Sequence, residues 1–237
     1  MRNSSALLVL ALSLALSAQT VHLPFVGCPS DGQTGPQEAP KGTDQVVRIK
    51  ATAARTLAFY TSGGGFGFLA PRGWRCFGLE GSGGSLLFVS PRSLKADNLF
   101  PMAGPTVELS STEGGGSGTA TVAEVWGRVF PAFWPIVKGL IDNGDLPREK
   151  YTFGPYPDDK LTVQTDRLVQ FQTPPRSEGL GTMGHLKAND DPIDGVALLQ
   201  GRNPDLLMLR VRLPREQRDL APMIIQDLLL RQRRDSR

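Results

Sequence analysis

The amino-acid sequence predicts a protein of the α+β class, in which an antiparallel sheet is flanked by helices. Three observations predict this class. Short strand-like runs, separated by Gly, Pro and Asn, follow one another along much of the chain. Two segments, one after Thr121 and one after Asp219, carry apolar residues at helical spacing. Finally, 40% of the 237 residues are hydrophobic, which suffices for one buried core.

The first twenty residues have the layout of a secretory signal peptide. Arg2 precedes an uncharged run from Ala6 to Leu16, which gives way to the small residues Ser17 and Ala18. The run is too short for a transmembrane helix, which needs about 20 apolar residues. We therefore expect residues 1–20 to be a cleaved signal peptide and the mature protein, starting near residues 18–21, to be periplasmic or secreted. A retained amphiphilic anchor or a buried core helix is the alternative.

Residues 21–54 are predicted to be an irregular Pro/Gly-rich segment, because turn-forming residues are concentrated between Pro29 and Gly42. A single α+β domain is predicted over residues 55–232. At its start, the apolar residues that lead up to Tyr60 suit a short helix, which the glycines at 63–65 would end.

Strands of the domain are predicted from alternation and from turn signals. In the last of them Leu207, Leu209 and Val211 share one face, while Arg210 and Arg212 share the other. A hairpin is predicted over the glycine-rich turn at 81–84. The predicted strands are residues 74–79, 85–90, 106–110, 165–173, 179–186, 193–200 and 206–213.

Two helices complete the predicted domain. The first starts at Thr121, where Thr121 and Glu124 have the capping-box pattern, and its apolar stripe would pack on the sheet. Pro131 and Pro135 should break or kink this helix, and a ligand cleft at the kink is the alternative to a purely structural role. The second helix begins near Asp219 and closes the fold over the sheet.

The two cysteines are Cys28 and Cys76. In an oxidising compartment an even number of thiols favours a disulfide, so we predict that Cys28 bonds Cys76. A lipid anchor on Cys28 is the alternative: Gly27 fits a lipoprotein site, but Phe25 stands where Leu is usual. Free or metal-bound thiols remain open, although two Cys and two His are a poor ligand set for zinc.

The charge of the chain argues against a nucleic-acid partner. The formal net charge is +3, and basic residues cluster only at the end, in a tail at 233–237. Binding to a polyanion needs charge gathered on one face. We interpret the tail as cations at a helix C-terminus, with contact to anionic lipid or an envelope polymer as the alternative.

The order of the elements, with Ala70-Pro71-Arg72-Gly73-Trp74 near the start, resembles the PsbP-like α/β/α sandwich, which includes exported bacterial lipoproteins of the DcrB type. This likeness covers about residues 55–232. The stretch Phe25-Val26-Gly27-Cys28-Pro29-Ser30-Asp31-Gly32 is also similar to exported bacterial proteins of unknown function. The PsbP-like resemblance implies a binding or assembly factor and carries over no catalytic motif.

His185 is the candidate general base of an enzyme. It would need a nucleophile, Ser82 or Ser85 of the glycine-rich turn, and an orienting carboxylate, Asp194 or its neighbours Asp190 and Asp191. The chain lacks the Gly-x-Ser-x-Gly elbow of Ser-His-Asp hydrolases. We therefore interpret the serines as turn residues and His185 as a surface or hydrogen-bonded histidine.

No cofactor or metal is predicted. The acidic segment 189–195 lacks the ligand spacing of a calcium loop, and no glycine tract has the P-loop or dinucleotide-binding pattern. We expect an exported, non-enzymatic binding or assembly factor of the bacterial envelope or extracellular space, with an unidentified envelope protein or ligand as partner. The alternative is an extracytoplasmic hydrolase that uses His185.

Overall fold

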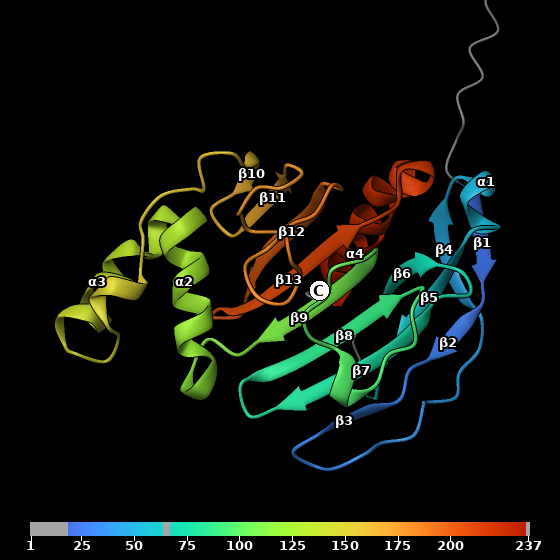
Figure 1. Ribbon diagram of the computed structural model, residues 1–237, viewed down its shortest axis with the longest axis horizontal. Coiled ribbons are helices and arrows are strands. Elements are labelled where there is room, and N and C mark those ends of the chain that lie inside the picture. Colours follow the sequence, from blue (N-terminus) through green and yellow to red (C-terminus); the bar gives the residue numbers. More distant parts are fainter. Residues whose placement is uncertain (1–18, 64–66, 236–237) are drawn as a thin grey trace, which may run out of the picture.

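The computed structural model describes residues 19–63 and 67–235. Within these residues the chain forms strands and helices in a mixed order, as expected of the α+β class (Figure 1). The strands are β1 (Gln19–Leu23), β2 (Phe25–Gly27), β3 (Ser30–Gly32), β4 (Gln45–Ile49), β5 (Leu57–Thr61), β6 (Gly67–Pro71), β7 (Arg75–Gly81), β8 (Gly84–Ser90), β9 (Thr106–Thr112), β10 (Lys160–Thr165), β11 (Leu168–Thr173), β12 (Ile193–Gln200) and β13 (Asp205–Arg212). The helices are α1 (Ala51–Ala54), α2 (Thr119–Val129), α3 (Trp134–Asp142) and α4 (Ala221–Asp235).

The strands form one large sheet and two small ones. The large sheet has eight strands in the order β10-β11-β12-β13-β9-β8-β7-β3, and every neighbouring pair is antiparallel except β3-β7. The small sheets are β1-β4 and β2-β5-β6. The two faces of the large sheet are covered by different elements.

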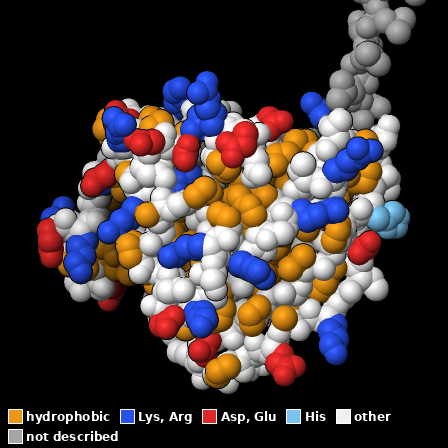
Figure 2. Space-filling view, turned by 45° about the vertical axis from the view of Figure 1, so that its right-hand side comes forward, with side chains coloured by type: hydrophobic (Ala, Val, Ile, Leu, Met, Phe, Trp, Pro, Cys, Tyr) orange, Lys and Arg blue, Asp and Glu red, His pale blue; other side chains and the backbone are white. Residues whose placement is uncertain are grey.

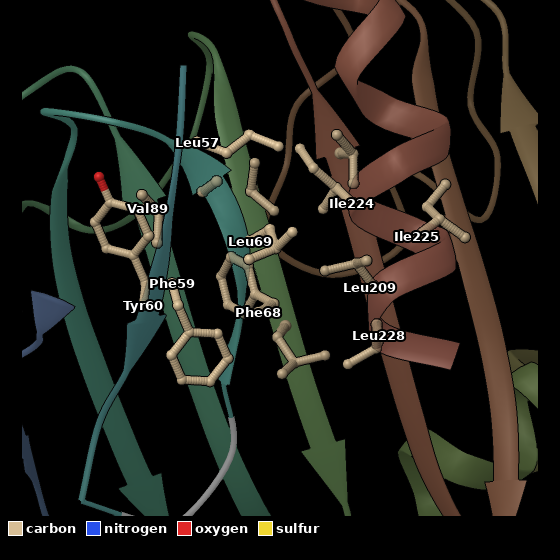
Figure 3. Packing of buried hydrophobic residues seen from close by; sticks show 14 of the residues in the cluster. Leu57, Phe59, Tyr60, Phe68, Leu69, Val89, Leu209, Ile224, Ile225 and Leu228 are labelled. Atoms are coloured by element: carbon tan, nitrogen blue, oxygen red, sulfur yellow. The ribbon is translucent and has the colours of Figure 1, made fainter. Parts of the chain in front are cut away.

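On the first face, helix α4 and the sheet β2-β5-β6 pack over a continuous apolar core. Leu207, Leu209 and Val211 of β13 point to this face, as their alternation in the sequence predicts. Figure 3 shows Ile224 and Leu228 on the side of α4 that faces Leu209. All three side chains are at most 1% exposed, so the layer between α4 and β13 is dry. A hollow of about 590 Å³ lies farther along the same face, between α4 and β10, β11 and β12, and is lined about equally by polar and apolar groups.

On the second face, cover comes from two separate places. Helices α2 and α3 pack over one end of β11, β12 and β13, through Val122, Trp126 and Phe130 among others (Figure 1). Two loops, residues 91–105 and 174–192, pack over the other end and bury Phe88 and Ile193. Because this cover is divided, part of the face lies open.

The predicted disulfide between Cys28 and Cys76 is confirmed. Cys28 follows β2 in the small sheet and Cys76 lies in β7, so the bond joins the small-sheet layer to the large sheet. It closes a loop with a sequence separation of 48, for which the chain-entropy model gives about 4 kcal/mol of stabilisation. A cysteine sulfur in a disulfide cannot carry a lipid, so the alternative of a lipid anchor on Cys28 does not apply to this structure.

The prediction that residues 21–54 are irregular is wrong. This segment contributes four strands and α1, and β1 pairs antiparallel with β4 across the Pro/Gly-rich stretch. Local composition does not show a pairing between strands that lie so far apart in the sequence. The helix expected before Tyr60 is also wrong, because only Ala51–Ala54 is helical and β5 follows. A strand buried on both faces is apolar throughout, so its periodicity does not distinguish it from a helix.

Two further predictions are corrected. Residues 179–186 form turns instead of a strand, because side chains satisfy their backbone: Asp159 accepts from the Leu180 amide and Thr173 from the Gly181 amide. Helix α2 begins at Thr119 with Gly118 as its N-cap and no side-chain capping bond, so the capping box at Thr121 is absent. The preceding 3-10 turn runs directly into α2, which places Thr121 inside the first turn.

Other sequence predictions are confirmed. The hairpin turns over residues 81–84, β12 spans Ile193–Gln200, and α2 ends at Val129, before Pro131.

Residues 1–18 of the predicted signal peptide lie outside the described residues, and Gln19 and Thr20 begin β1. In the described part of the chain, none of the helices is long and apolar enough to span a membrane. Figure 2 shows Lys and Arg side chains spread over the visible face, with Asp and Glu between them.

Candidate functional site

An open cleft of about 560 Å³ lies on the second face of the large sheet, between the two parts of its cover. Strands β7, β8, β9 and β13 contribute the floor, and the N-terminal half of α2 forms one wall. The β7-β8 hairpin and loop residues 183–185 complete the lining. The apolar side chains that face it are Leu79, Leu86, Val125, Met183, Leu206 and Met208, and the hydroxyl-bearing ones are Ser110, Thr112, Ser117 and Thr121. Most of the accessible lining is apolar, with hydroxyl groups interspersed.

Glycine residues allow the hairpin to close one end of the cleft. Gly84 has a φ of +137°, and a Cβ at this position would lie 1.9 Å from the carbonyl oxygen of Ser111 on β9. Any other residue would push β8 away from β9, because this contact is with backbone. The Ser117 and Ser82 hydroxyls are 3.0 Å apart and hydrogen-bonded, which ties the hairpin to the segment that leads into α2.

A buried charged cluster lies next to the cleft. Glu108 of β9 is fully buried, and its Oε1 accepts hydrogen bonds from Nη1 of Arg210 at 2.8 Å and from Nδ1 of His185 at 3.1 Å. Burial alone would raise the pKa of Glu108, but the Arg210 charge and the His185 hydrogen bond outweigh it and hold the pKa below its ordinary value. Glu108 is therefore an ionised partner for Arg210.

Two buried arginines hold down the loops that border the cleft. Besides bonding Glu108, Arg210 donates to the carbonyl oxygens of Leu180 at 3.1 Å and Met183 at 2.7 Å. Arg212 is fully buried and donates to the carbonyl oxygens of Gly104, Met102 and Lys187. Desolvation lowers the pKa of Arg212 to about 10, so it stays protonated at neutral pH. These bonds join both loops to β13.

His185 lies where the cleft meets the second loop. Its side chain is 31% exposed, and its ring stacks on Phe100 with the ring centroids 4.6 Å apart. Phe88 meets the same ring edge-on at 5.6 Å. The ring is thus fixed by two aromatic contacts and by Glu108, which confirms the interpretation of His185 as a hydrogen-bonded histidine.

The structure does not assemble the catalytic triad proposed from the sequence. The Ser82 hydroxyl bonds Ser117 and not His185. Asp194 accepts a hydrogen bond from Gln172 and points to the α4 face of the sheet, opposite to His185. Since side chains alternate along a strand, Asp194 shares the face of Val196 and cannot reach the cleft.

The other candidate residues are also placed by the structure. Asp190 pairs with Arg176 and Asp191 with Arg218, so neither orients His185. Ser85 borders the same cleft as His185, but it alternates with Leu86, so its side chain points to the other face of the sheet. Among the described residues, no serine or threonine hydroxyl is hydrogen-bonded to the His185 ring, whose one hydrogen bond goes to Glu108.

Sequence reasoning missed Glu108, which proved to be the carboxylate partner of His185. Glu108 alternates with Val107 and Leu109, and this alternation is typical of a strand with one solvent-exposed face. One sequence pattern could have indicated the cluster. Glu108 on one predicted strand and Arg210 and Arg212 on another all lie on the side opposite to the apolar stripe of their strand. Burial of both strands would then require opposite charges to pair.

One glutamate side chain also faces the cleft, that of Glu124 from α2. Glu80 of β7 borders the cleft, but it alternates with Leu79 and its side chain points to the other face of the sheet. Because Thr121 does not cap the helix, the Glu124 carboxylate is not held at the N-cap as the capping box predicted. Burial raises the pKa of Glu124 above its ordinary value, and the Arg128 charge opposes this only in part.

The residues that the structure describes contain no group of three His, Cys, Asp or Glu side chains placed to hold a metal ion. Comparisons of the chain with protein-family models, with curated proteins and with solved structures found no match. The site therefore has to be interpreted from its own geometry.

Proposed function

We propose that this chain is an exported, non-enzymatic binding protein of the bacterial envelope or extracellular space, whose ligand occupies the cleft between α2 and the β7-β8 hairpin. The observation that carries the proposal is the cleft itself, a mostly apolar hollow of about 560 Å³ with hydroxyl groups in its walls. Small-molecule sites are typically concave and apolar, with a few polar groups that orient the ligand.

The apolar floor is the second support. Leu79 and Leu86 belong to the apolar cluster under the loops but are only partly buried, because the cover of this face is divided. Apolar side chains left open at the bottom of a cleft favour a ligand with an apolar body.

Export is supported by the signal-peptide pattern and by the disulfide, because disulfides persist in oxidising compartments. We also propose that the fold is a PsbP-like sandwich, which includes many binding and assembly factors. Helices lie on both faces of the large sheet, which agrees with α/β/α layers.

A variant that fills the cleft tests the binding function. Leu86→Trp places an indole in the floor, while Val163→Trp adds the same group to β10 at a position that is 66% exposed and outside the cleft. Isothermal titration with octan-1-ol, a neutral amphiphile, should show binding to the wild type with a Kd below about 1 mM. Leu86→Trp should abolish this binding and Val163→Trp should preserve it. No binding to the wild type, or equal binding by both variants, would overturn the proposal.

A hydrolase that uses His185 is the second candidate, and the Glu108–His185 pair favours it. A carboxylate that orients the Nδ1 of a histidine is one half of a catalytic triad. A panel of esters and peptides, tested with the wild type and with His185→Ala, distinguishes the two candidates. Turnover that disappears in His185→Ala supports the hydrolase, whereas turnover by neither protein supports the binding function.

A further inference from the structure

The charged groups of the cleft limit what its ligand can be. Three ionisable side chains face it, those of Glu124, His185 and Arg210. Glu80 alternates with Leu79 along β7, so its side chain points to the other face of the sheet. Arg210 is 5% exposed and all of its nitrogens donate to protein acceptors, among them Glu108, Leu180 and Met183. Its charge is therefore matched by Glu108 and is not free to bind a ligand anion.

Glu124 is in the opposite situation. In residues 19–63 and 67–235, the Glu124 side chain forms no ion pair. Arg128 lies one helical turn after Glu124, but its guanidinium stacks on the Tyr156 ring, 4.0 Å from the centroid. The cleft thus retains one carboxylate that forms no ion pair and that the Arg128 charge compensates only in part, although the protein as a whole carries a formal net charge of +3.

Glu124 is placed to contact a ligand. It lies between Thr121 and Val125 in the helical wall, and all three residues line the cleft. Its partial burial is unfavourable for an unpaired carboxylate, because burial disfavours the charged form. A cation bound beside Glu124 would offset this cost and form a charge-assisted hydrogen bond.

We propose that the cleft binds a cationic amphiphile, an organic amine whose apolar body lies on Leu79, Leu86 and Met208 and whose ammonium group lies at Glu124. The hydroxyl groups of the walls accept the remaining ammonium hydrogens. This inference rests on the proposed function, since it names the ligand class of the same cleft.

A matched series of ligands tests the charge preference. Octylamine, octan-1-ol and octanoate share one chain and differ in the head group, and isothermal titration can compare them below their micelle-forming concentrations. The wild type should bind octylamine at least about tenfold more tightly than octan-1-ol, and octanoate most weakly. Added salt should weaken the binding of octylamine and leave that of octan-1-ol unchanged.

Glu124→Gln tests the assigned residue. This substitution keeps the size of the side chain and removes its charge, so affinity for octylamine should fall about tenfold while affinity for octan-1-ol stays the same. Glu149→Gln, an exposed glutamate outside the cleft, is the matched control and should change neither.

The outcomes separate the inference from the function on which it rests. If the wild type binds all three ligands equally, or if Glu124→Gln binds octylamine as the wild type does, the amine preference is wrong and the binding function stands. If none of the three ligands binds, the binding function itself fails. The salt dependence of the wild type decides the charge preference even if Glu124→Gln does not fold.

Discussion

The two faces of the large sheet differ in how they are buried. The α4 face is covered by one helix and one small sheet, and its apolar core extends across the sheet, with Leu168 of β11 and Leu209 of β13 among its residues. The opposite face is covered from two sides, and there Glu108, Arg210 and Arg212 are buried among apolar side chains. The first face is held mainly by hydrophobic contacts, whereas the second uses hydrogen bonds from arginines to hold its loops in place. Each face carries a hollow, but the lining beside α4 is about equally polar and apolar, so we place the candidate site in the mostly apolar cleft of the second face.

The largest effect is expected from removing the carboxylate of the buried cluster. Glu108→Leu leaves Arg210 buried without a counter-charge, which should lower the free energy of unfolding by about 3–5 kcal/mol. The double variant Glu108→Leu/Arg210→Met replaces both charges by apolar groups, so its free energy of unfolding should fall by less than that of Glu108→Leu alone. Urea unfolding measures both. A double variant that is no more stable than Glu108→Leu would show that the ion pair does not govern this face.

On the α4 face, a cavity should destabilise the protein without touching the cleft. Leu209 is fully buried against α4, so Leu209→Ala should cost about 2–5 kcal/mol of unfolding free energy. Its affinity for octan-1-ol should equal that of the wild type under conditions where both are folded. Weaker binding by Leu209→Ala would mean that the two faces are coupled and that the comparison between them is too simple.

Acid should act on the cleft face through Glu108. The pKa of Glu108 is lower in the folded protein than its ordinary value of 4.5, so its contribution is complete above that pH and is lost as pH falls through the folded pKa. The difference in unfolding free energy between the wild type and Glu108→Leu should therefore shrink as the pH drops below 4.5. The difference for Leu209→Ala should stay constant over the same range, since no charge is involved. Urea titrations at several pH values measure both differences.

The smallest effect is expected from Asp194→Asn. Asp194 points to the α4 face, where burial raises its pKa and the Gln172 hydrogen bond opposes that rise. Its folded pKa lies above the unfolded one, so ionised Asp194 does not add stability at pH 7, and the amide should change stability by no more than about 0.5 kcal/mol. Binding in the cleft should be unchanged. A loss of binding in Asp194→Asn would mean that Asp194 contributes to the cleft, which contradicts its assignment to the other face.

Local sequence patterns predicted much of the sheet and its helices. The hairpin over 81–84, the span of β12 and the break before Pro131 follow from turn residues, alternation and the missing amide of proline, all of which act within a few positions. The N-terminal strands could not be predicted in this way. β1 pairs with β4 across the Pro/Gly-rich stretch, and the hydrogen bonds of such a pair depend on where the two segments meet in the fold.

The candidate site was predicted only in part. His185, Ser82 and Asp194 were identified as chemically competent residues, but nothing in the sequence showed which face of the sheet each would reach. Glu108 was missed because its alternation with Val107 and Leu109 is typical of a solvated face. Its pairing with Arg210 exists because loops from two distant parts of the chain cover both residues.

The sequence by itself determined the properties that depend on residue type and near neighbours. These are the α+β class, the signal-peptide pattern and the pairing of the only two cysteines. Alternation also determined that Leu209 and Arg210 lie on opposite faces of β13. Only the tertiary structure decided which of those faces carries the mostly apolar cleft. The reason is that burial is a property of the whole chain. A polar stripe becomes a solvated surface or a buried network according to the segments that come to lie over it.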